Sequence, residues 1–193
     1  MSSHDYPIVI VPGLRGHVDE HWQTKLAAKL PNARVVPLGR PKRDLAGRVA
    51  DLQQVITEAD APVTIVAHSA GVLVTVHWAA QHDLPVRAAL LATPPDGVSP
   101  LGPEYPSLEE LEESGWLPIP RGRLRFSSIL AASTNDTLGD HDRVRSLGDA
   151  WGSRLVDIGA VGHLNPASGY GRWPKAHEFI AELSATSTET LAR

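Results

Sequence analysis

The sequence predicts an α/β fold in which a six-stranded, mainly parallel sheet is covered by helices on both faces. Six short apolar runs alternate with stretches in which apolar residues recur every three or four positions, the pattern of strands alternating with amphipathic helices. The runs are apolar throughout rather than alternating in polarity, which indicates strands buried on both faces. A length of 193 residues suits one domain, so we expect residues 1–193 to form a single unit.

The expected strands combine β-branched and small apolar residues. In chain order they are Ile8–Val11, Ala33–Pro37, Val63–Ala67, Ala88–Ala92, Ser127–Ala132 and Arg154–Ile158. Active sites of parallel sheets lie beyond the carboxyl ends of the strands. The residues that directly follow these runs are therefore the candidates for chemistry.

The expected helices lie between the strands. The first places Trp22, Leu26 and Leu30 on one face. Asp19 is its expected N-cap and Pro31 marks its end. The other expected helices are Leu45–Ile56, Gly71–Gln81, Val144–Trp151 and Trp173–Leu183.

Two segments depart from this alternation. Residues 93–121 hold seven prolines and five glutamates, a composition typical of a lid, a binding loop or a solvated connector. Leu108 and Leu111, three apart, predict one short helical turn there. The segment is too apolar for a purely solvated connector, so we expect Trp116 to wall an apolar pocket that prefers small or medium neutral acyl groups. Residues 184–193 are rich in Ser and Thr, and we expect a frayed tail.

The composition excludes several classes of function. The 18 basic and 22 acidic residues give a net charge of −4, which provides no electrostatic attraction to nucleic acid. The chain holds no cysteine, which excludes disulfides, thiolate nucleophiles and cysteine-ligated metals. No apolar run approaches the roughly 18 residues of a membrane span, and Met1–Asp5 lacks the basic start of a secretory signal. We therefore expect a cytoplasmic protein, and the sequence does not indicate its oligomeric state.

The pentapeptide Ala67-His68-Ser69-Ala70-Gly71 is the strongest candidate for chemistry. It connects an expected strand to an expected helix, which is the context of a nucleophile elbow. Small residues two before and two after the serine, here Ala67 and Gly71, allow the tight turn that presents Ser69 Oγ. The alternative is that Ser69 simply caps a βα turn, a common role of serine.

A nucleophilic serine requires a base, and the base requires an orienting acid. In elbow hydrolases the acid and then the histidine follow the serine along the chain. Asp136 follows the fifth expected strand and His163 the sixth, so both side chains can converge on Ser69. Asp140 and Asp142 are alternatives that could instead cap the next helix. Asp136 is preferred because it is closer to the strand end, and Asp140 is the fallback.

The other histidines offer weaker assignments. His17 and His21 are four apart, but Glu20 stands beside the second histidine rather than the first, so the zinc-binding His-Glu-x-x-His pattern fails. We expect these three residues to be solvated at a helix start. His68 is expected to point aside from the nucleophile. No metal and no cofactor is expected.

An acyl-transfer site also needs two backbone N–H groups that hold the oxyanion. The N–H of Ala70, directly after the nucleophile, is one candidate. The loop Pro12–Gly16 after the first strand offers the other, and Leu14 is preferred because Gly13 lets the backbone turn inward. The loop lacks the glycine and lysine patterns of phosphate and dinucleotide sites.

Four segments carry a family pattern together. They are Val9–Gly13, Ala67–Gly71, Ala132–Asp136 and Gly162–Asn165, the last followed by Ser168–Pro174. With them the chain resembles, over about Pro7 to Leu183, the bacterial branch of the small α/β-hydrolases of the retinoblastoma-binding-protein type. The resemblance implies a minimal α/β-hydrolase sheet of strand order 2-1-3-4-5-6.

The same resemblance implies serine esterase activity on short acyl esters, with Ser69, Asp136 and His163 as the triad. Thr137 stands where the family often has proline, which suggests a less rigid acid loop. The family's retinoblastoma-binding motif contains a cysteine, which this chain lacks.

The expected reaction is hydrolysis of small-molecule carboxylic esters, or of amides or thioesters, through an acyl-enzyme. An acyltransferase would use the same triad, and a binding module would keep the fold without the chemistry. Halide or epoxide chemistry in this fold uses an aspartate nucleophile, and Ser69 argues against it.

Overall fold

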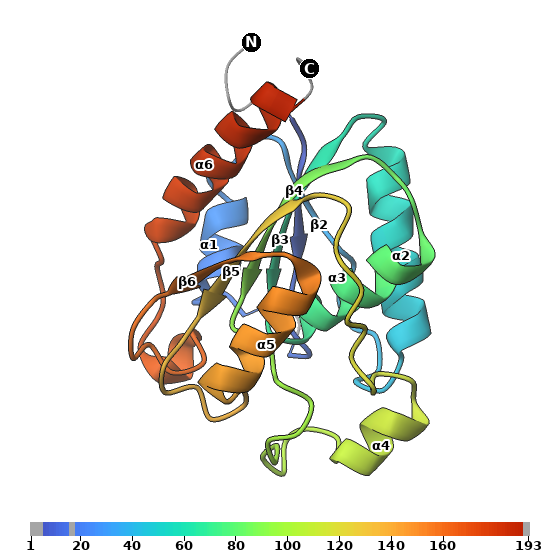
Figure 1. Ribbon diagram of the computed structural model, residues 1–193, viewed down its shortest axis with the longest axis vertical. Coiled ribbons are helices and arrows are strands. Elements are labelled where there is room, and N and C mark those ends of the chain that lie inside the picture. The colour runs from blue at the N-terminus through green and yellow to red at the C-terminus, as the bar shows by residue number, and fades with distance from the viewer. Residues whose placement is uncertain (1–5, 16–17, 191–193) are drawn as a thin grey trace.

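The computed structural model describes residues 6–15 and 18–190, and a six-stranded sheet forms its centre (Figure 1). The strands are β1 (Ile8–Val11), β2 (Ala33–Val35), β3 (Val63–His68), β4 (Val86–Ala92), β5 (Ser127–Ala132) and β6 (Arg154–Asp157). All five neighbouring pairs are parallel, and the order across the sheet is β2-β1-β3-β4-β5-β6. The expected fold class and strand order are confirmed.

Helices cover both faces of the sheet, α1 and α6 on one side and α2, α3 and α5 on the other (Figure 1). The α-helices are α1 (Trp22–Ala27), α2 (Leu45–Glu58), α3 (Ala70–Gln81), α4 (Leu108–Glu113), α5 (His141–Trp151) and α6 (Lys175–Thr190). Because the strands are parallel, their carboxyl ends meet at one edge of the sheet. The loops that leave this edge carry the candidate residues.

Successive strand residues enter two different apolar layers. In β1, Ile8 and Ile10 pack in the layer of α1 and α6, whereas Val9 and Val11 pack in the layer of α2 and α3. A strand covered on both sides needs apolar residues at every position, which explains the continuous runs in the sequence. Full burial of one such side chain contributes about 1.5–3 kcal/mol.

Helix α1 begins differently from the expectation. Its N-cap is His21, whose Nδ1 accepts a hydrogen bond from the N–H of Gln23 at 3.2 Å. The prediction of Asp19 as the cap is wrong, because the helix starts at Trp22. Trp22, the first residue of the helix, is buried, and its ring packs edge to face on Trp173 with centroids 4.9 Å apart.

Helix α6 continues to Thr190, beyond Leu183, where the sequence analysis ends the expected final helix. Leu183 is buried and anchors the preceding turn. No glycine or proline follows it to end the helix. Residues 191–193 lie outside the described residues.

The 93–121 segment is an ordered structure rather than a solvated connector. Helix α4 begins with a capping box, in which Ser107 Oγ accepts from the N–H of Glu110 and the Glu110 carboxylate accepts from the N–H of Ser107, at 3.1 and 2.9 Å. Arg43, just before α2, pairs with Glu110 at 3.3 Å and with Glu113 at 3.0 Å.

Trp116 is a core residue, and the prediction that it walls a substrate pocket is wrong. Its side chain is 1% exposed and packs in the layer of α2 and α3, together with Leu111 and Ile119. The backbone carbonyl of Trp116 accepts a hydrogen bond from His77 Nε2 of α3 at 3.0 Å. After α4 the chain turns back into the core, and this turn carries the indole away from the carboxyl edge.

The loop after β1 crosses directly over the start of α3. A Cβ atom at Gly71 would overlap the carbonyl oxygen of Val11 and lie 2.8 Å from that of Pro12. A Cβ atom at Gly13 would lie 3.2 Å from Ser69 Cβ. Position 71 therefore has no room for any side chain, and the loop lies within contact of Ser69.

We expect Gly71→Ala to lower the free energy of unfolding by about 1–3 kcal/mol, because the added methyl group forces the loop away from the helix. Gly122→Ala is the matched control, since a Cβ atom there meets nothing within 4 Å. Urea unfolding followed by circular dichroism measures both variants. Equal unfolding midpoints would show that the loop moves aside without cost.

Candidate active site

Ser69 occupies the turn between β3 and α3 at the carboxyl edge of the sheet. Its φ of 57° and ψ of −129° form a strained backbone conformation that non-glycine residues rarely adopt. Its N–H donates to the carbonyl of Ala92 at 3.0 Å, which ties the turn to the end of β4. Thr93 and Leu164 also have positive φ, 42° and 49°. In the described part of the chain, three of the four strained non-glycine residues thus lie in the loops around this edge.

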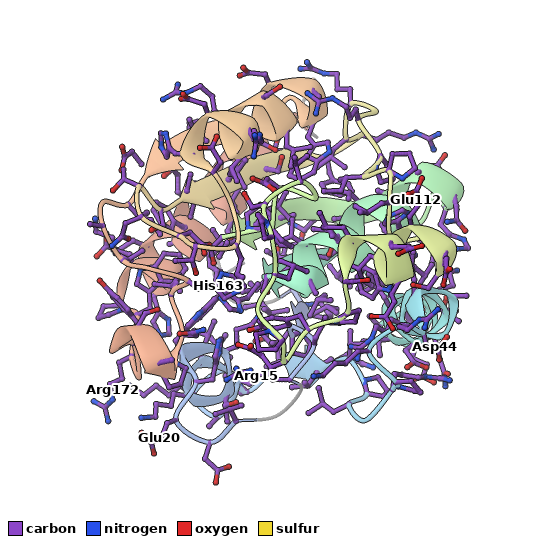
Figure 2. The ribbon with its side chains drawn as sticks, turned by 90° about the horizontal axis from the view of Figure 1, so that it is seen from below. Arg15, Glu20, Asp44, Glu112, His163 and Arg172 are labelled. Carbon is purple, nitrogen blue, oxygen red and sulfur yellow. The ribbon has the colours of Figure 1, made fainter. Side chains whose placement is uncertain are left out.

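The structure brings Ser69, His163 and Asp136 into one hydrogen-bonded row. His163 Nε2 lies 2.8 Å from Ser69 Oγ, and His163 Nδ1 lies 2.8 Å from Asp136 Oδ2. Seen from the carboxyl edge, His163 lies near the centre of the molecule (Figure 2). An ionised carboxylate only accepts, so Nδ1 carries the proton and Nε2 accepts from the Ser69 hydroxyl. These are the three residues that the sequence singled out.

Asp140, the fallback acid, has a different role. It is the N-cap of α5, and its Oδ1 accepts from the N–H of Arg143 at 3.1 Å. Asp136 Oδ1 accepts from the N–H of Leu138 at 2.9 Å, which leaves Oδ2 directed at His163. Of the two aspartates, Asp136 is the one that contacts the histidine.

A single amide side chain joins the acid loop to the histidine loop. Asn135 Oδ1 accepts from the N–H of Gly162 at 2.6 Å and from Ser133 Oγ at 3.1 Å. These contacts tie the loop that carries Asp136 to the loop that carries His163.

Asp96, near the start of the 93–121 segment, forms a hydrogen bond with the loop that carries Asp136. Its side chain is fully buried, and one oxygen accepts from the N–H of Asp140 at 2.9 Å while the other accepts from the N–H of Ser99 at 2.6 Å. Burial raises the pKa of Asp96, but the hydrogen bonds from Ser99, from Val98 and from Asp140 outweigh burial, and the net pKa is lowered. The sequence analysis missed this residue, although aspartate commonly accepts a hydrogen bond from the backbone N–H two residues on in a turn, as Asp96 does from Val98 at 2.7 Å.

The histidine loop is built from its own side chains. The N–H of His163 donates to Ser168 Oγ at 3.1 Å, and Ser168 donates from N and from Oγ to Asn165 Oδ1 at 3.0 and 3.1 Å. Asn165 thereby caps the short 3₁₀ helix Pro166–Ser168. Gly162 has a φ of +58°, and a Cβ atom there would lie 2.5 Å from Ser168 Oγ. The Gly-His-x-Asn…Ser-Gly pattern therefore encodes the position of the imidazole.

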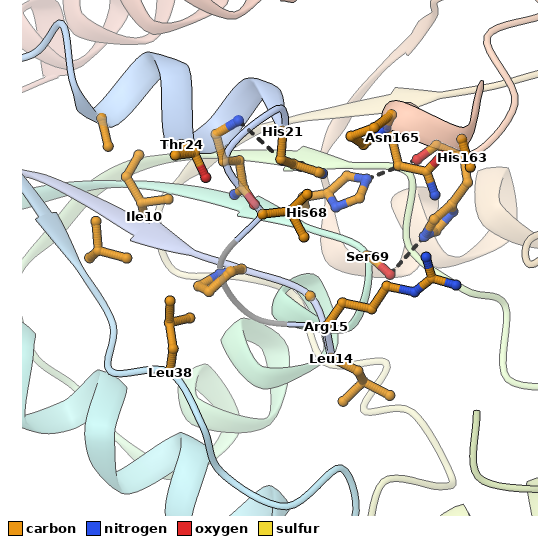
Figure 3. Close-up of a pocket in the computed structure, with 18 of the residues that line it drawn as sticks. Ile10, Leu14, Arg15, His21, Thr24, Leu38, His68, Ser69, His163 and Asn165 are labelled. Carbon is orange, nitrogen blue, oxygen red and sulfur yellow. Dashed lines mark hydrogen bonds between the residues drawn. The ribbon is translucent and has the colours of Figure 1, made fainter. Parts of the chain in front are cut away.

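Two further imidazoles lie behind His163 (Figure 3). His68 Nε2 donates to the backbone carbonyl of His163 at 2.9 Å, and the two ring centroids are 5.0 Å apart. The His21 ring lies 4.7 Å from that of His68. The prediction that His21 is solvated is wrong, because the start of α1 packs over the ends of the central strands. Glu20 is exposed, and His17 lies outside the described residues.

Both of these imidazoles are neutral at pH 7. Burial and then the nearby His163 lower the pKa of His21 to about 4. Burial, His163 and His21 lower the pKa of His68 well below the usual 6.5. The two rings therefore add aromatic surface to the site without adding charge.

The two expected oxyanion donors come from the loop after β1 and from the start of α3. Ala70 is the first residue of α3, so its N–H has no acceptor within the helix. Leu14 follows Gly13, the residue packed against Ser69. Among hydrogen bonds between described residues, none has either of these N–H groups as its donor. Gly16, the end of the expected loop, lies outside the described residues.

A cavity of about 340 Å³ begins at Ser69 and extends between α1 and the β1–β2 edge of the sheet. Figure 3 shows Ile10, Thr24 and Leu38 on the opposite side of His68 from His163. Tyr105 is the cavity residue that the 93–121 segment contributes. The segment thus reaches the site through Tyr105 and not through Trp116.

The comparison with protein families matches residues 8–182 to the serine hydrolase family. The chain belongs to this family. A solved structure from Pectobacterium atrosepticum, named as a YdeN-like hydrolase, is 27% identical to this serine hydrolase with a TM-score of 0.80. The match covers 96% of this chain and 94% of that one. The chain is thus an α/β-hydrolase enzyme.

Two more distant structures share the fold of this serine hydrolase. The YdeN product of Bacillus subtilis is 16% identical with a TM-score of 0.73, covering 93% of this chain and 99% of that one. Est1E of Butyrivibrio proteoclasticus is 12% identical with a TM-score of 0.68, covering 100% of this chain and 92% of that one. No curated protein sequence matches the chain. In the described residues, no helix combines the length and apolar character needed to cross a membrane.

We expect the serine hydrolase to lose stability through His21 as the pH falls. The unfolded imidazole binds a proton below about pH 6.5, whereas the folded one does so only below about pH 4. The contribution of neutral His21 to the free energy of unfolding is therefore fully present above pH 6.5 and is lost as the pH falls toward 4. The free energy of unfolding should be lower by on the order of 2 kcal/mol at pH 4.5.

The variant His21→Asn tests this expectation, because asparagine keeps a capping acceptor for α1 but does not titrate. Urea unfolding at pH 7, 5.5 and 4.5 should show a smaller decrease in the free energy of unfolding for the variant than for the wild type. Parallel pH dependences for the two proteins would show that the pKa of the half-buried His21 is not lowered in the folded protein.

Proposed function

We propose that this serine hydrolase cleaves carboxylic esters through a covalent acyl-enzyme on Ser69, with His163 as the base and Asp136 as the orienting acid. The observation that carries the proposal is the pair of 2.8 Å hydrogen bonds from Asp136 through both nitrogens of His163 to Ser69 Oγ. The same row of side chains performs acyl transfer on several unrelated folds. Amides and thioesters fall within the same chemistry.

Acylation begins when His163 Nε2 takes the Ser69 proton. The Oγ atom forms a bond to the carbonyl carbon, and the carbonyl π electrons move to the oxygen. When the oxyanion collapses, the bond to the leaving alkoxide breaks, and that oxygen takes the proton from His163 Nε2. Water then repeats the sequence on the acyl-enzyme and releases the acid and free Ser69. The mechanism requires neither a metal nor an organic cofactor.

The oxyanion is held, in this proposal, by the N–H groups of Leu14 and Ala70. Ala70 lies at the positive end of the α3 dipole, which favours negative charge beside Ser69. A Cβ atom added at Gly13 would lie only 3.2 Å from Ser69 Cβ. This close packing supports a loop whose backbone lies near the reacting carbonyl group. Donors fixed before the reaction stabilise the developing charge without reorganisation.

Asp136 fixes the histidine tautomer and stabilises the imidazolium that forms during each step. Its carboxylate is 3% exposed, so the interaction with His163 is little screened by solvent. The substrate in this proposal is a small-molecule ester, and we propose a cytoplasmic location because the chain contains no cysteine.

We expect Ser69→Ala to abolish ester hydrolysis and labelling by a fluorophosphonate while the circular dichroism spectrum stays unchanged. The substitution removes one hydroxyl group from a surface turn and leaves the core intact. Loss of the nucleophile costs on the order of 10⁶-fold in kcat in a serine hydrolase of this mechanism. A labelled wild type that turns over acyl groups faster with an added alcohol or thiol than with water would be an acyltransferase. Absence of labelling in the wild type would indicate a binding module.

We expect Asp136→Asn to lower kcat by about 10⁴-fold, because the amide favours the wrong histidine tautomer. Asp140→Asn is the matched control, since asparagine also caps a helix and Asp140 does not contact His163. Steady-state kinetics on a short acyl ester measures both. A larger loss in the Asp140 variant than in the Asp136 variant would contradict the assignment.

A further inference from the structure

We propose that the cavity beside Ser69 is the acyl site and that it selects neutral aliphatic acyl chains of about six to eight carbons. This inference rests on the proposed ester hydrolysis and adds the class of substrate to it. It is argued from the wall of the cavity, its charge, its direction from Ser69 and its size.

The far part of the cavity has an apolar wall. Ile10 of β1, Val35 of β2 and Leu38 line it from the edge of the sheet. Ala27, the last residue of α1, and its C-cap Ala28 line it from the opposite side. Between these small residues and the branched side chains of the sheet, the far part of the cavity is a narrow space that offers a ligand few hydrogen-bonding groups.

The cavity also lacks charge away from its mouth. Among the described residues that line it, Arg15 alone carries a permanent charge, and Arg15 is half exposed and pairs with Glu104 at 3.3 Å. His21 is neutral at pH 7, since its pKa is lowered to about 4. The Gln23 amide nitrogen donates to backbone carbonyls of β1 and β3 at 3.2 and 3.0 Å. An ionised group in the far part of the cavity would have no partner, which disfavours charged substrates.

The direction of the cavity assigns it to the acyl group. The leaving group receives a proton from His163 Nε2, so it departs on the side of Ser69 where His163 lies. Ile10, Thr24 and Leu38 lie on the other side of His68 (Figure 3). The chain that fills the cavity is therefore attached to the carbonyl carbon that Ser69 attacks.

The size of the cavity limits the chain. A volume of about 340 Å³ is at the lower end of the range for small-molecule sites. A water molecule, similar in size to a methylene group, takes about 30 Å³. Some of the space belongs to the reacting carbonyl. Val35 is 45% exposed and Leu38 37% exposed, so methylene groups that pass them return to solvent and gain little.

A series of p-nitrophenyl esters from acetyl to dodecanoyl tests the inference in the wild-type enzyme. We expect kcat/KM to rise about fourfold per methylene group up to about eight carbons and then to level off, since each buried methylene contributes about 0.8 kcal/mol. Acetate esters of alcohols of increasing length should show no such rise. A rise of kcat/KM in the alcohol series instead of the acyl series would show that the cavity holds the alcohol and not the acyl chain.

The variant Ala27→Leu fills the far part of the cavity from α1, and Ala50→Leu is its matched control. Ala50 is an exposed residue of α2, on the other face of the sheet. We expect the ratio of octanoyl to acetyl kcat/KM to fall on the order of tenfold in Ala27→Leu. The ratio should stay at the wild-type value in Ala50→Leu. If the ratio of octanoyl to acetyl kcat/KM is unchanged in both variants, the cavity does not bind the acyl chain and the inference is wrong.

The two proposals fail in different ways. If Ser69 is labelled by a fluorophosphonate and short esters are hydrolysed without dependence on acyl length, ester hydrolysis stands and the acyl-site inference is wrong. If Ser69 is not labelled and no ester in either series is hydrolysed, the proposed function itself is wrong, and the acyl site falls with it.

Discussion

The close packing of the loop after β1 on the start of α3 is the constraint on which the rest of the site depends. Gly71 is there because the carbonyl oxygens of that loop occupy the space of a side chain. The same contact keeps Gly13 against Ser69 and leaves the serine in a backbone conformation that is costly for any residue with a side chain. It positions Ser69, both candidate oxyanion donors and the beginning of the cavity together. A shift of this loop would therefore disturb binding and chemistry together.

His163 and Asp136 are held at Ser69 by hydrogen bonds between loops and not by the sheet alone. Asn135 joins the acid loop to the histidine loop, and Asp96 holds the acid loop from the root of the 93–121 segment. His68, the residue next to Ser69, donates to the backbone carbonyl of His163. Asp96 and His68 are buried, so their hydrogen bonds are worth more than bonds at the surface, whereas Asn135 is exposed. These hydrogen bonds keep the two loops, and with them Asp136 and His163, in line with Ser69.

The 93–121 segment contributes side chains both to the apolar core and to the cavity. Trp116 and its apolar neighbours fill the layer of α2 and α3, whereas Tyr105 lines the cavity. The ion pairs that join Arg43 to α4 are exposed, and such pairs contribute about 0–1 kcal/mol each. The burial of the apolar side chains therefore decides where the segment lies, and the ion pairs only add to it.

The sequence by itself determined the alternation of strands and helices, the parallel sheet, and the positions of Ser69, Asp136 and His163, because these depend on local patterns and on the rule that loops at strand ends converge. It could not place His21 or Trp116. Their environments depend on how α1 and the 93–121 segment pack against strands distant in the chain. The pocket-lining Trp116 and the solvated His21 expected from local pattern were both wrong, since periodicity shows which residues share a face but not what covers that face. Only the tertiary structure decided where the cavity lies, because its walls come from segments that meet only after the sheet has formed.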